Sequence, residues 1–322
     1  MMDPATIVEA RGRIDDVVRS TPMLTSTTLG GLADAEVVLK CEMLQRTGSF
    51  KVRGATNRIR TLDIEVRRQG VVTASGGNHA QGVAFAAAIA GVDSTIVMPE
   101  STSRAKVEAT RSYGGDVIIH GRDYNEAAAR AHVIEREEGM TYVHAFEDEA
   151  VIAGQGTVGL EVLEDRPDVD AILVPIGGGG LISGIALAVA HSDTDARVIG
   201  VQAEGADAAG RSVEAGELIE LDSVDTIAEG MATRHIGELT LAVISEHVDQ
   251  LVTVSDTSMA RAIRLLLERS KLLTEPAGAA PVAALLEGAI SIGSDEVVVP
   301  VLSGGNLDLD DLPRILDKGD SS

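Results

Sequence analysis

Lys51 combines a nucleophilic amine with an apolar setting. It lies between Phe50 and Val52 in the run Gln-Arg-Thr-Gly-Ser-Phe-Lys-Val-Arg-Gly-Ala, residues 45–55, and it is one of only five lysines in the chain. Partial desolvation beside Phe50 would lower the pKa of the amine and leave a neutral nucleophile that can form an imine with a carbonyl group. A solvated surface position is the more common situation for a lysine, so the rest of the sequence has to decide between the two.

A run of four glycines, residues 177–180, follows an apolar segment and precedes an apolar helix that begins near Leu181. Glycines allow the backbone to approach a ligand closely, and successive N–H groups at the start of a helix bind phosphate. The run predicts a phosphate site, with a flexible turn as the alternative. A dinucleotide-binding fingerprint fits less well, because the sixth position of the G-x-G-x-x-G pattern is Ile182.

Two further loops offer polar groups after predicted strands. In Ser-Gly-Gly-Asn-His, residues 75–79, backbone N–H groups could hold a carboxylate, and the Asn78 amide could donate to a phenolate-type oxygen. Asn78 could instead cap the following helix, and His79 is more typical of a packing residue than of a catalyst. In Ser-Gly-Gly-Asn, residues 303–306, Ser303 could face a ring nitrogen, although these residue types are also ordinary in turns.

Short β-rich runs alternate with helical stretches along the chain. The predicted strands are Val71–Thr73, Thr95–Met98, Val117–Ile119, Ile172–Ile176, Val198–Val201, Leu251–Val254 and Val297–Leu302. The predicted helices are Arg104–Tyr113, Asn125–Glu137, Gly154–Glu164, Leu181–Ala190, Thr257–Glu268 and Pro276–Leu286, with a buried helix around Val83–Ala90. This alternation favours parallel sheets covered by helices, and ligands bind such sheets at the carboxyl ends of strands, where the three loops lie.

The composition excludes several classes of partner. The 322 residues include 50 acidic and 27 basic side chains, for a net charge of −23, so neither nucleic acid nor an anionic membrane surface is an expected partner. The length suggests two domains. Because only five of the basic residues are lysines, the acidic, arginine-rich surface is typical of adaptation to high salt, and we expect stability to fall on dilution of salt.

Cys41 is the single cysteine, so an intramolecular disulfide and a thiolate metal cluster are both excluded. The N-terminus shows no signal-peptide pattern, and no apolar run approaches the roughly 20 residues that a membrane-spanning helix needs. These observations predict a cytoplasmic location.

Together the four segments resemble the fold type II family of pyridoxal-phosphate (PLP) enzymes, and specifically the branch of threonine (serine) dehydratases and serine racemases. They occur in the family's order over nearly the whole chain. Shorter runs support the resemblance: Ala153-Gly154-Gln155-Gly156-Thr157, Ile227-Ala228-Glu229-Gly230 and Glu275-Pro276-Ala277-Gly278-Ala279. The resemblance implies an α/β fold of two open, mostly parallel twisted sheets flanked by helices, as in the tryptophan synthase β chain. The cofactor is expected in the cleft between a large domain, residues 1–65 plus 148–322, and a small domain, residues 66–147.

The resemblance also implies roles for individual residues. Lys51 would bind the cofactor covalently, Phe50 would pack against its ring, and Asn78 would donate to its ring hydroxyl oxygen. The residues expected to hold the phosphate are Gly177, Gly178, Gly179, Gly180 and Leu181. Ser303 would hydrogen-bond the pyridine nitrogen. The residues expected to bind the substrate carboxylate are Ser75, Gly76, Gly77, Asn78 and His79. Glu275 is expected close to the ring, with its role left open.

The implied activity is loss of the β-hydroxyl from L-threonine, followed by tautomerisation and hydrolysis in water to 2-oxobutanoate and ammonia; L-serine would give pyruvate. A neutral serine at the pyridine nitrogen does not hold that nitrogen protonated, so the ring withdraws electrons less and loss of the β-hydroxyl is favoured. Lys51 would remove the α-proton, and the cofactor phosphate or a nearby acid would protonate the departing hydroxyl. The short chain resembles the catabolic type without a regulatory domain, and a homodimer is the family expectation.

Other functions stay open. A serine racemase needs a proton donor opposite the lysine, and Gly76 stands where racemases have a serine. A 3-hydroxyaspartate dehydratase would use the same machinery, whereas β-replacing enzymes differ around the lysine. Outside enzymes, a catalytically silent ligand-binding protein on this scaffold would be expected to lack the lysine. A divalent cation at Glu204 is possible, although Gly210 stands at the family's second carboxylate position and Asp207 would have to substitute for it.

Overall fold

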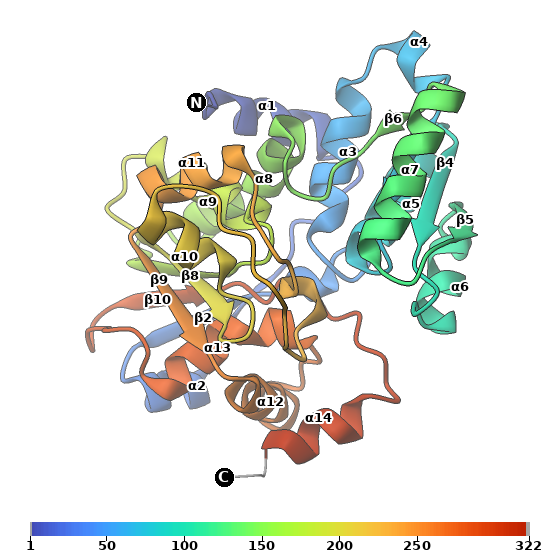
Figure 1. Cartoon of the computed structure of the whole chain (residues 1–322). Coiled ribbons are helices and arrows are strands. Elements are labelled where there is room, and N and C mark those ends of the chain that lie inside the picture. The colour runs from blue at the N-terminus through green and yellow to red at the C-terminus, as the bar shows by residue number, and fades with distance from the viewer. Residues whose placement is uncertain (1, 320–322) are drawn as a thin grey trace.

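The computed structural model describes residues 2–319, so Met1 and residues 320–322, at the two ends of the predicted large domain, lie outside the described part. The chain forms two separate sheets (Figure 1). The larger sheet has the strand order β1 (Met23–Thr25), β2 (Glu36–Lys40), β10 (Val297–Pro300), β7 (Ala171–Pro175), β8 (Arg197–Ala203) and β9 (Gln250–Val254). All its neighbours run parallel except β1 and β2, which pair antiparallel.

The smaller sheet is entirely parallel, with the order β5 (Asp116–Ile119), β4 (Ser94–Met98), β3 (Val71–Ala74) and β6 (Thr141–Tyr142). Figure 1 shows its strands and helices as a separate group in green and teal, beside the rest of the chain. Its central strands β3 and β4 are buried along their whole length, which explains why they show no alternation of apolar and charged residues.

Helices cover both faces of the larger sheet. One apolar cluster joins it to α2 (Thr27–Ala33), α12 (Asp256–Leu265), α13 (Pro276–Glu287) and α14 (Leu312–Gly319). The opposite cluster includes α8 (Glu149–Asp165), α9 (Gly180–Ala190), α10 (Ala208–Ala215) and α11 (Glu238–His247). Within β7, Leu173 belongs to the first cluster and Ile172 to the second, as the alternation of side chains along a strand requires.

The smaller sheet is covered by α5 (Asn78–Ala90) and α6 (Arg104–Ser112) on one face and by α7 (Tyr124–Glu138) on the other. The remaining helical segments are α1 (Ala5–Ile14), α3 (Lys51–Thr61), α4 (Ile64–Arg67), the 3-10 turns Glu42–Leu44 and Glu229–Met231, and the π turn Leu266–Ser270. None of the helices in residues 2–319 has the length and apolarity needed to cross a membrane.

Helix α3 packs closely against both α5 and α8 because glycines remove the side chains between them. A Cβ atom on Gly154 would lie 2.6 Å from the Cα atom of Gly54, and one on Gly82 would lie 3.1 Å from the carbonyl carbon of Lys51. The first distance is shorter than real Cβ atoms show, and the second would require the neighbouring atom to shift by a few tenths of an ångström. The backbone around Lys51 is therefore held between helices of the two sheets.

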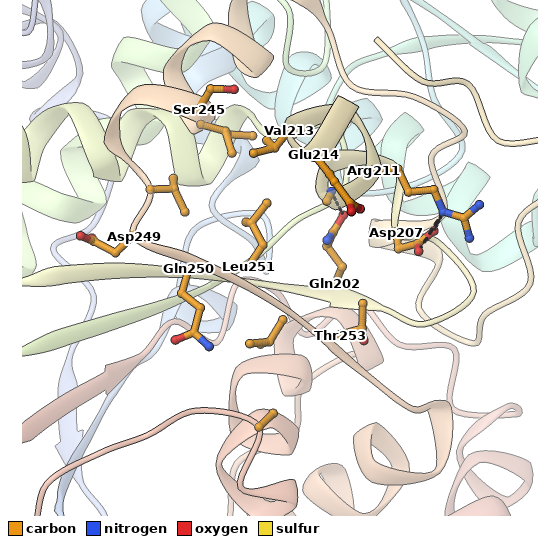
Figure 2. Close-up of a pocket in the computed structure, with 15 residues that line it drawn as sticks. Gln202, Asp207, Arg211, Val213, Glu214, Ser245, Asp249, Gln250, Leu251 and Thr253 are labelled. Atoms are coloured by element: carbon orange, nitrogen blue, oxygen red, sulfur yellow. Dashed lines mark hydrogen bonds and ion pairs between the residues drawn. The ribbon is translucent and has the colours of Figure 1, made fainter. Parts of the chain in front are cut away.

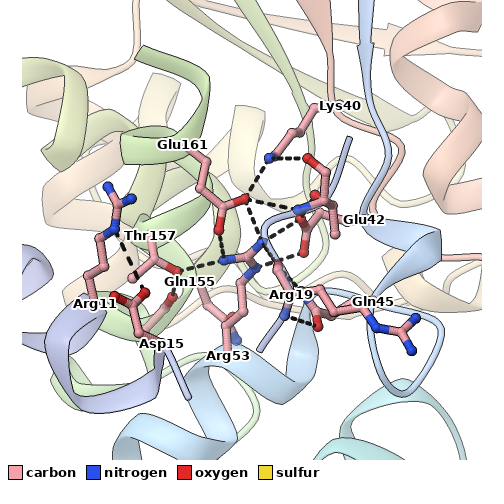
Figure 3. A network of polar contacts seen from close by, with 12 residues as sticks. Arg11, Asp15, Arg19, Lys40, Glu42, Gln45, Arg53, Gln155, Thr157 and Glu161 are labelled. Atoms are coloured by element: carbon pink, nitrogen blue, oxygen red, sulfur yellow. Dashed lines mark hydrogen bonds and ion pairs between the residues drawn. The ribbon is translucent and has the colours of Figure 1, made fainter. Parts of the chain in front are cut away.

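A buried network of charged side chains anchors the same helix (Figure 3). Arg53 of α3 donates to both oxygens of Glu42 (2.8 Å each) and to both oxygens of Glu161 (2.6 and 2.8 Å), and its side chain is completely buried. Lys40 donates to Glu161 at 2.6 Å and to the Thr21 carbonyl at 2.9 Å. Two cations thus face two carboxylates, so the cost of burying each charge is offset by its partners.

The predicted fold class is confirmed. All seven predicted strands lie within or next to observed ones, whereas β1, β2 and β6 were not predicted. Helix α8 begins five residues before the predicted Gly154, because the Asp148 side chain accepts from the Val151 N–H and caps the helix. Helix α12 ends at Leu265, before the predicted Glu268, because the chain continues as a π turn.

We predict that Glu161→Gln lowers the free energy of unfolding by about 3–5 kcal/mol, because it leaves two buried cations with one carboxylate. Urea unfolding at fixed salt measures this. Glu65→Gln is the matched control: Glu65 pairs with Arg68 on the exposed surface of α4, so a change within about 1 kcal/mol is expected. Equal effects of the two substitutions would contradict the proposed importance of the network.

Candidate active site

Lys51 is the first residue of α3, and the loop before it is joined to the C-terminal Ser-Gly-Gly-Asn loop. The Phe50 N–H donates to the Ser303 carbonyl at 3.1 Å, and Ser49 forms a β-bridge with Gly304. Ser303 is buried. The fold therefore brings together two segments that are about 250 residues apart in sequence, as their positions after neighbouring strands β2 and β10 allow.

The Lys51 amine lies in a half-buried position. Its Nζ atom donates to the Ala145 carbonyl at 2.8 Å and stands 5.1 Å from the centroid of the Phe50 ring. Burial lowers the pKa of the amine to about 8, and the nearby Glu275 carboxylate acts in the opposite direction. A substantial fraction of Lys51 is thus neutral near pH 8, as a nucleophile or a proton acceptor requires.

The turn that presents the Ala145 carbonyl is organised by His144. The Nδ1 atom of His144 accepts from the N–H groups of Phe146 (3.2 Å) and Glu147 (2.8 Å), so the ring is neutral in this arrangement. Burial lowers the pKa of His144 to about 4, which is consistent with that state. Glu147 in turn accepts from the Leu239 N–H (2.6 Å) at the start of α11.

Asn78 does not cap α5, because Gly77 is the N-cap residue and no side chain caps the helix. Its side chain points instead to two residues from the C-terminal half of the chain. The Nδ2 atom donates to Oε1 of Glu275 (2.6 Å), and the Oδ1 atom accepts from Nδ2 of Asn306 (2.7 Å). Burial raises the pKa of Glu275 to about 7, and the hydrogen bond from Asn78 acts in the opposite direction.

The other side chains of the 75–79 loop are used within the fold. The Ser75 hydroxyl accepts from the Gly77 N–H at 3.2 Å. His79 is buried, and its Nε2 atom lies 2.9 Å from the Val143 carbonyl. Because burial lowers the pKa of His79 to about 3, the ring is neutral and donates this hydrogen bond. The other ring nitrogen, Nδ1, has no hydrogen-bond partner within residues 2–319 and, in this neutral ring, carries a lone pair that can accept.

The tetraglycine loop, residues 177–180, opens α9 with Gly179 at φ +91°, a conformation that favours glycine. The Phe146 ring covers this loop: a Cβ on Gly178 would stand 2.1 Å from Cδ1 of Phe146. A Cβ on Gly177 would stand 2.6 Å from the Gly230 carbonyl. Phe146 follows Ala145, which accepts from Lys51, so the loop and the lysine share one neighbourhood.

A cavity of about 50 Å³ lies beside Glu275 and is also lined by Lys106, Glu229, Gly230 and Asn306. Lys106 of α6 forms an ion pair with Glu229, which joins the helices of the small sheet to the large-sheet part of the chain. The residues around Glu275 thus come from the parts of the chain that pack on each of the two sheets.

A larger, open pocket of about 680 Å³ lies along the edge strand β9 and contains none of these residues (Figure 2). Its Arg211 is paired with Asp207 at 2.9 Å. Glu204, the predicted metal ligand, is exposed at the end of β8, and within residues 2–319 no three His, Cys, Asp or Glu side chains gather closely enough to hold a metal ion. Neither this pocket nor Glu204 forms part of the Lys51 site.

Comparisons with known proteins agree with this geometry. Residues 14–304 match the family model described as pyridoxal-phosphate dependent enzyme. The chain belongs to that family. It is 46% identical to a Geobacter sulfurreducens protein named L-threonine ammonia-lyase, covering 99% of this chain and 79% of that protein. It is 42% identical to a Staphylococcus aureus protein named catabolic L-threonine dehydratase, covering 97% of this chain and 91% of that protein. The solved structure of maize serine racemase superposes on this chain with a TM-score of 0.93 at 38% sequence identity. The match covers 98% of this chain and 97% of the racemase chain.

The residues present fit the cofactor of this PLP-dependent family. The pKa of the Lys51 amine is depressed, the tetraglycine backbone precedes a helix and carries no side chains, and Asn78 offers an amide donor. Sequence reasoning did not identify Ala145 or Phe146 as part of this site, and it included Asn306 only as the last residue of the 303–306 loop, with no role of its own. No motif in the sequence predicts that Ala145 contacts Lys51, or that Asn306 contacts Asn78. Only the rarity of phenylalanine, with three in the chain, sets Phe146 apart.

We predict that Gly178→Ala destabilises the protein by about 1–3 kcal/mol, because the new methyl group would displace the Phe146 ring. Thermal unfolding measures the change. Gly12→Ala, in α1, is the matched control, because its methyl group would meet no atom within 4 Å. That variant should be unchanged or more stable by up to about 1 kcal/mol. A Gly178→Ala protein as stable as Gly12→Ala would show that the loop has room for side chains.

Proposed function

We propose that this PLP-dependent enzyme is a threonine/serine ammonia-lyase that converts L-threonine to 2-oxobutanoate and ammonia, and L-serine to pyruvate and ammonia. The observation that carries the proposal is the placement of a lysine amine with a depressed pKa beside the Ser303 segment and the turn that covers the tetraglycine loop. The relatives named L-threonine ammonia-lyase and L-threonine dehydratase support this substrate class.

Each residue has a distinct task in the proposed site. Lys51 would hold PLP covalently, the backbone of residues 177–181 would hold its phosphate, and Phe50 would pack against its ring. When bound, PLP withdraws electrons from the α-carbon of an amino acid. Once the substrate amine has displaced it from the cofactor, the freed Lys51 amine would take the proton from that carbon, because an amine with a pKa of about 8 has a neutral fraction near neutral pH.

Ser303 and the 75–79 loop would set the reaction type. A neutral hydroxyl at the pyridine nitrogen favours elimination of the β-hydroxyl over a long-lived carbanion. The backbone N–H groups of residues 75–79 would bind the substrate carboxylate, although the Ser75 N–H already donates to the Val97 carbonyl and the Gly77 N–H to the Ser75 hydroxyl. Racemisation needs a second proton donor, and Gly76 has no side chain that could transfer one.

Several finer points belong to the same proposal. We propose that the large domain comprises residues 1–65 plus 148–322 and the small domain residues 66–147. The boundaries of the small domain are supported by the four strands of the smaller sheet, which all lie between residues 71 and 142. A homodimer in the cytoplasm stays a prediction, as do 3-hydroxyaspartate as a substrate and the dependence of stability on salt.

We predict that purified protein with PLP forms a 2-oxo acid from L-threonine and L-serine, and that Lys51→Ala lowers kcat by at least about 10³-fold because both the anchor and the base are lost. The assay measures 2-oxo acid and D-serine in parallel. Lys271→Ala, an exposed lysine, is the control and should retain activity. D-serine as the main product from L-serine would favour the racemase instead, and an active Lys51→Ala protein would contradict the assignment of the lysine.

The depressed pKa of Lys51 predicts a specific pH dependence for PLP uptake by the cofactor-free protein. Only the neutral amine reacts, so the rate should rise about tenfold per pH unit below pH 8 and level off above it. Stopped-flow absorbance follows the reaction, with N-α-acetyl-lysine as the control for an ordinary amine. A rate that continues to rise to pH 10, as for the free amine, would show that the burial of Lys51 does not lower its pKa.

A further inference from the structure

The orientation of the Asn306 amide is fixed by the main chain. Its Nδ2 atom donates to the Thr47 carbonyl and to Oδ1 of Asn78, both at 2.7 Å. A carbonyl oxygen can only accept, so the nitrogen of Asn306, and not its oxygen, must face Thr47. Both amide hydrogens of Asn306 are then donated in hydrogen bonds. The atom of Asn78 that faces this nitrogen must therefore be an acceptor, its Oδ1.

This fixes the orientation of Asn78 in turn. Because its Oδ1 atom accepts from Asn306, its Nδ2 atom faces the other way and donates to Oε1 of Glu275 at 2.6 Å. One hydrogen of the Asn78 amide is thereby used, and the second is left for a ligand. An amide that is held at both ends cannot exchange its donor and acceptor by rotation without losing two hydrogen bonds.

The surroundings leave little room for another arrangement of these three side chains. Gly48 has φ +73°, and a Cβ there would lie 2.3 Å from Oδ1 of Asn306. A Cβ on Gly304 would lie 2.6 Å from Oε1 of Glu275 and 3.2 Å from Nδ2 of Asn78. The glycines of the lysine loop and of the C-terminal loop thus make space for the same hydrogen-bonded chain.

Glu275 can serve as the acceptor in either protonation state. Burial raises the pKa of its carboxyl to about 7, so both forms are present near neutral pH. The ionised form accepts through either oxygen, and the protonated form still has a carbonyl oxygen that accepts. The orientation of Asn78 therefore does not depend on the charge of Glu275.

We propose that Asn306 and Glu275 are positioning residues that fix the Asn78 amide with its free N–H directed at the ring hydroxyl oxygen of bound PLP. The inference rests on the proposed function, because it takes Asn78 as the donor to that oxygen. Without Asn306 the amide can turn and present its oxygen, which repels the ring oxygen instead of binding it. The preset orientation strengthens cofactor binding because the donor is already in place when the cofactor arrives.

The test measures the dissociation constant for PLP and the visible absorption band of the holoenzyme, which reports the environment of the ring oxygen. Asn306→Ala and Glu275→Ala should each weaken PLP binding by about tenfold or more and change the shape of the band. Glu275→Gln retains an accepting oxygen and should keep the band of the wild type. In an Asn78→Ala background, Asn306→Ala should cause no further change of the band, because the proposal connects Asn306 to the ring oxygen only through Asn78.

The matched control is Asn57→Ala. Like Asn306, Asn57 is an asparagine whose Nδ2 atom donates to a main-chain carbonyl, that of Ala150 at 2.7 Å, but it is buried, whereas Asn306 is half-buried, and it does not hydrogen-bond Asn78. It should lower the melting temperature and leave the band unchanged. A change of the band in Asn57→Ala equal to that in Asn306→Ala would overturn the positioning role, because general destabilisation would explain both.

Failure of this inference can be distinguished from failure of the proposed function. A wild-type band together with unchanged PLP binding in Asn306→Ala and Glu275→Ala overturns the positioning role alone. Additive effects of Asn306→Ala and Asn78→Ala overturn it as well, since Asn306 would then act independently. Absence of any band in the wild type after addition of PLP overturns both proposals.

Discussion

The buried pairing of Arg53 with Glu42 and Glu161 is the interaction on which the position of Lys51 depends most. Arg53 follows Lys51 by two residues in α3, so the helix cannot slide or rotate without breaking hydrogen bonds of a fully buried guanidinium. Burial disfavours the charge of Arg53, but the two carboxylates outweigh that effect and raise its pKa. An unpaired charge in this position would be costly, and the network therefore favours one placement of the helix.

Close backbone packing adds to this constraint. Glycines 54 and 154 allow α3 to approach α8, and Gly82 of α5 lies against the Lys51 backbone. The lysine is thus held by one helix from each sheet, while its amine reaches the turn at Ala145. The same principle shapes the ligand loops, where Gly178 leaves room for Phe146 and Gly48 leaves room for Asn306. Small residues set the site's geometry and polar side chains provide its chemistry.

Local signals in the sequence were sufficient for the fold class and for much of the proposed site. Lys51, the tetraglycine and Ser303 each follow a strand or open a helix, so their placement can be predicted from nearby residues. Strands β1 and β6 were missed because they are only three and two residues long and owe their pairing to neighbours elsewhere in the chain. The residues that join the site could not be predicted for the same reason. Asn78 meets Glu275 across 197 positions, and Lys51 meets Ala145 across 94.

Of the five lysines, we expect Lys51 alone to carry the cofactor. Reduction of the holoenzyme with borohydride would make the lysine–cofactor bond permanent, and mass spectrometry of the digested protein would locate it. The pyridoxyl group should appear on the peptide that contains Lys51 alone. A label on Lys40, Lys106, Lys271 or Lys318, or no label on a protein that retains its visible band, would contradict the assignment of Lys51.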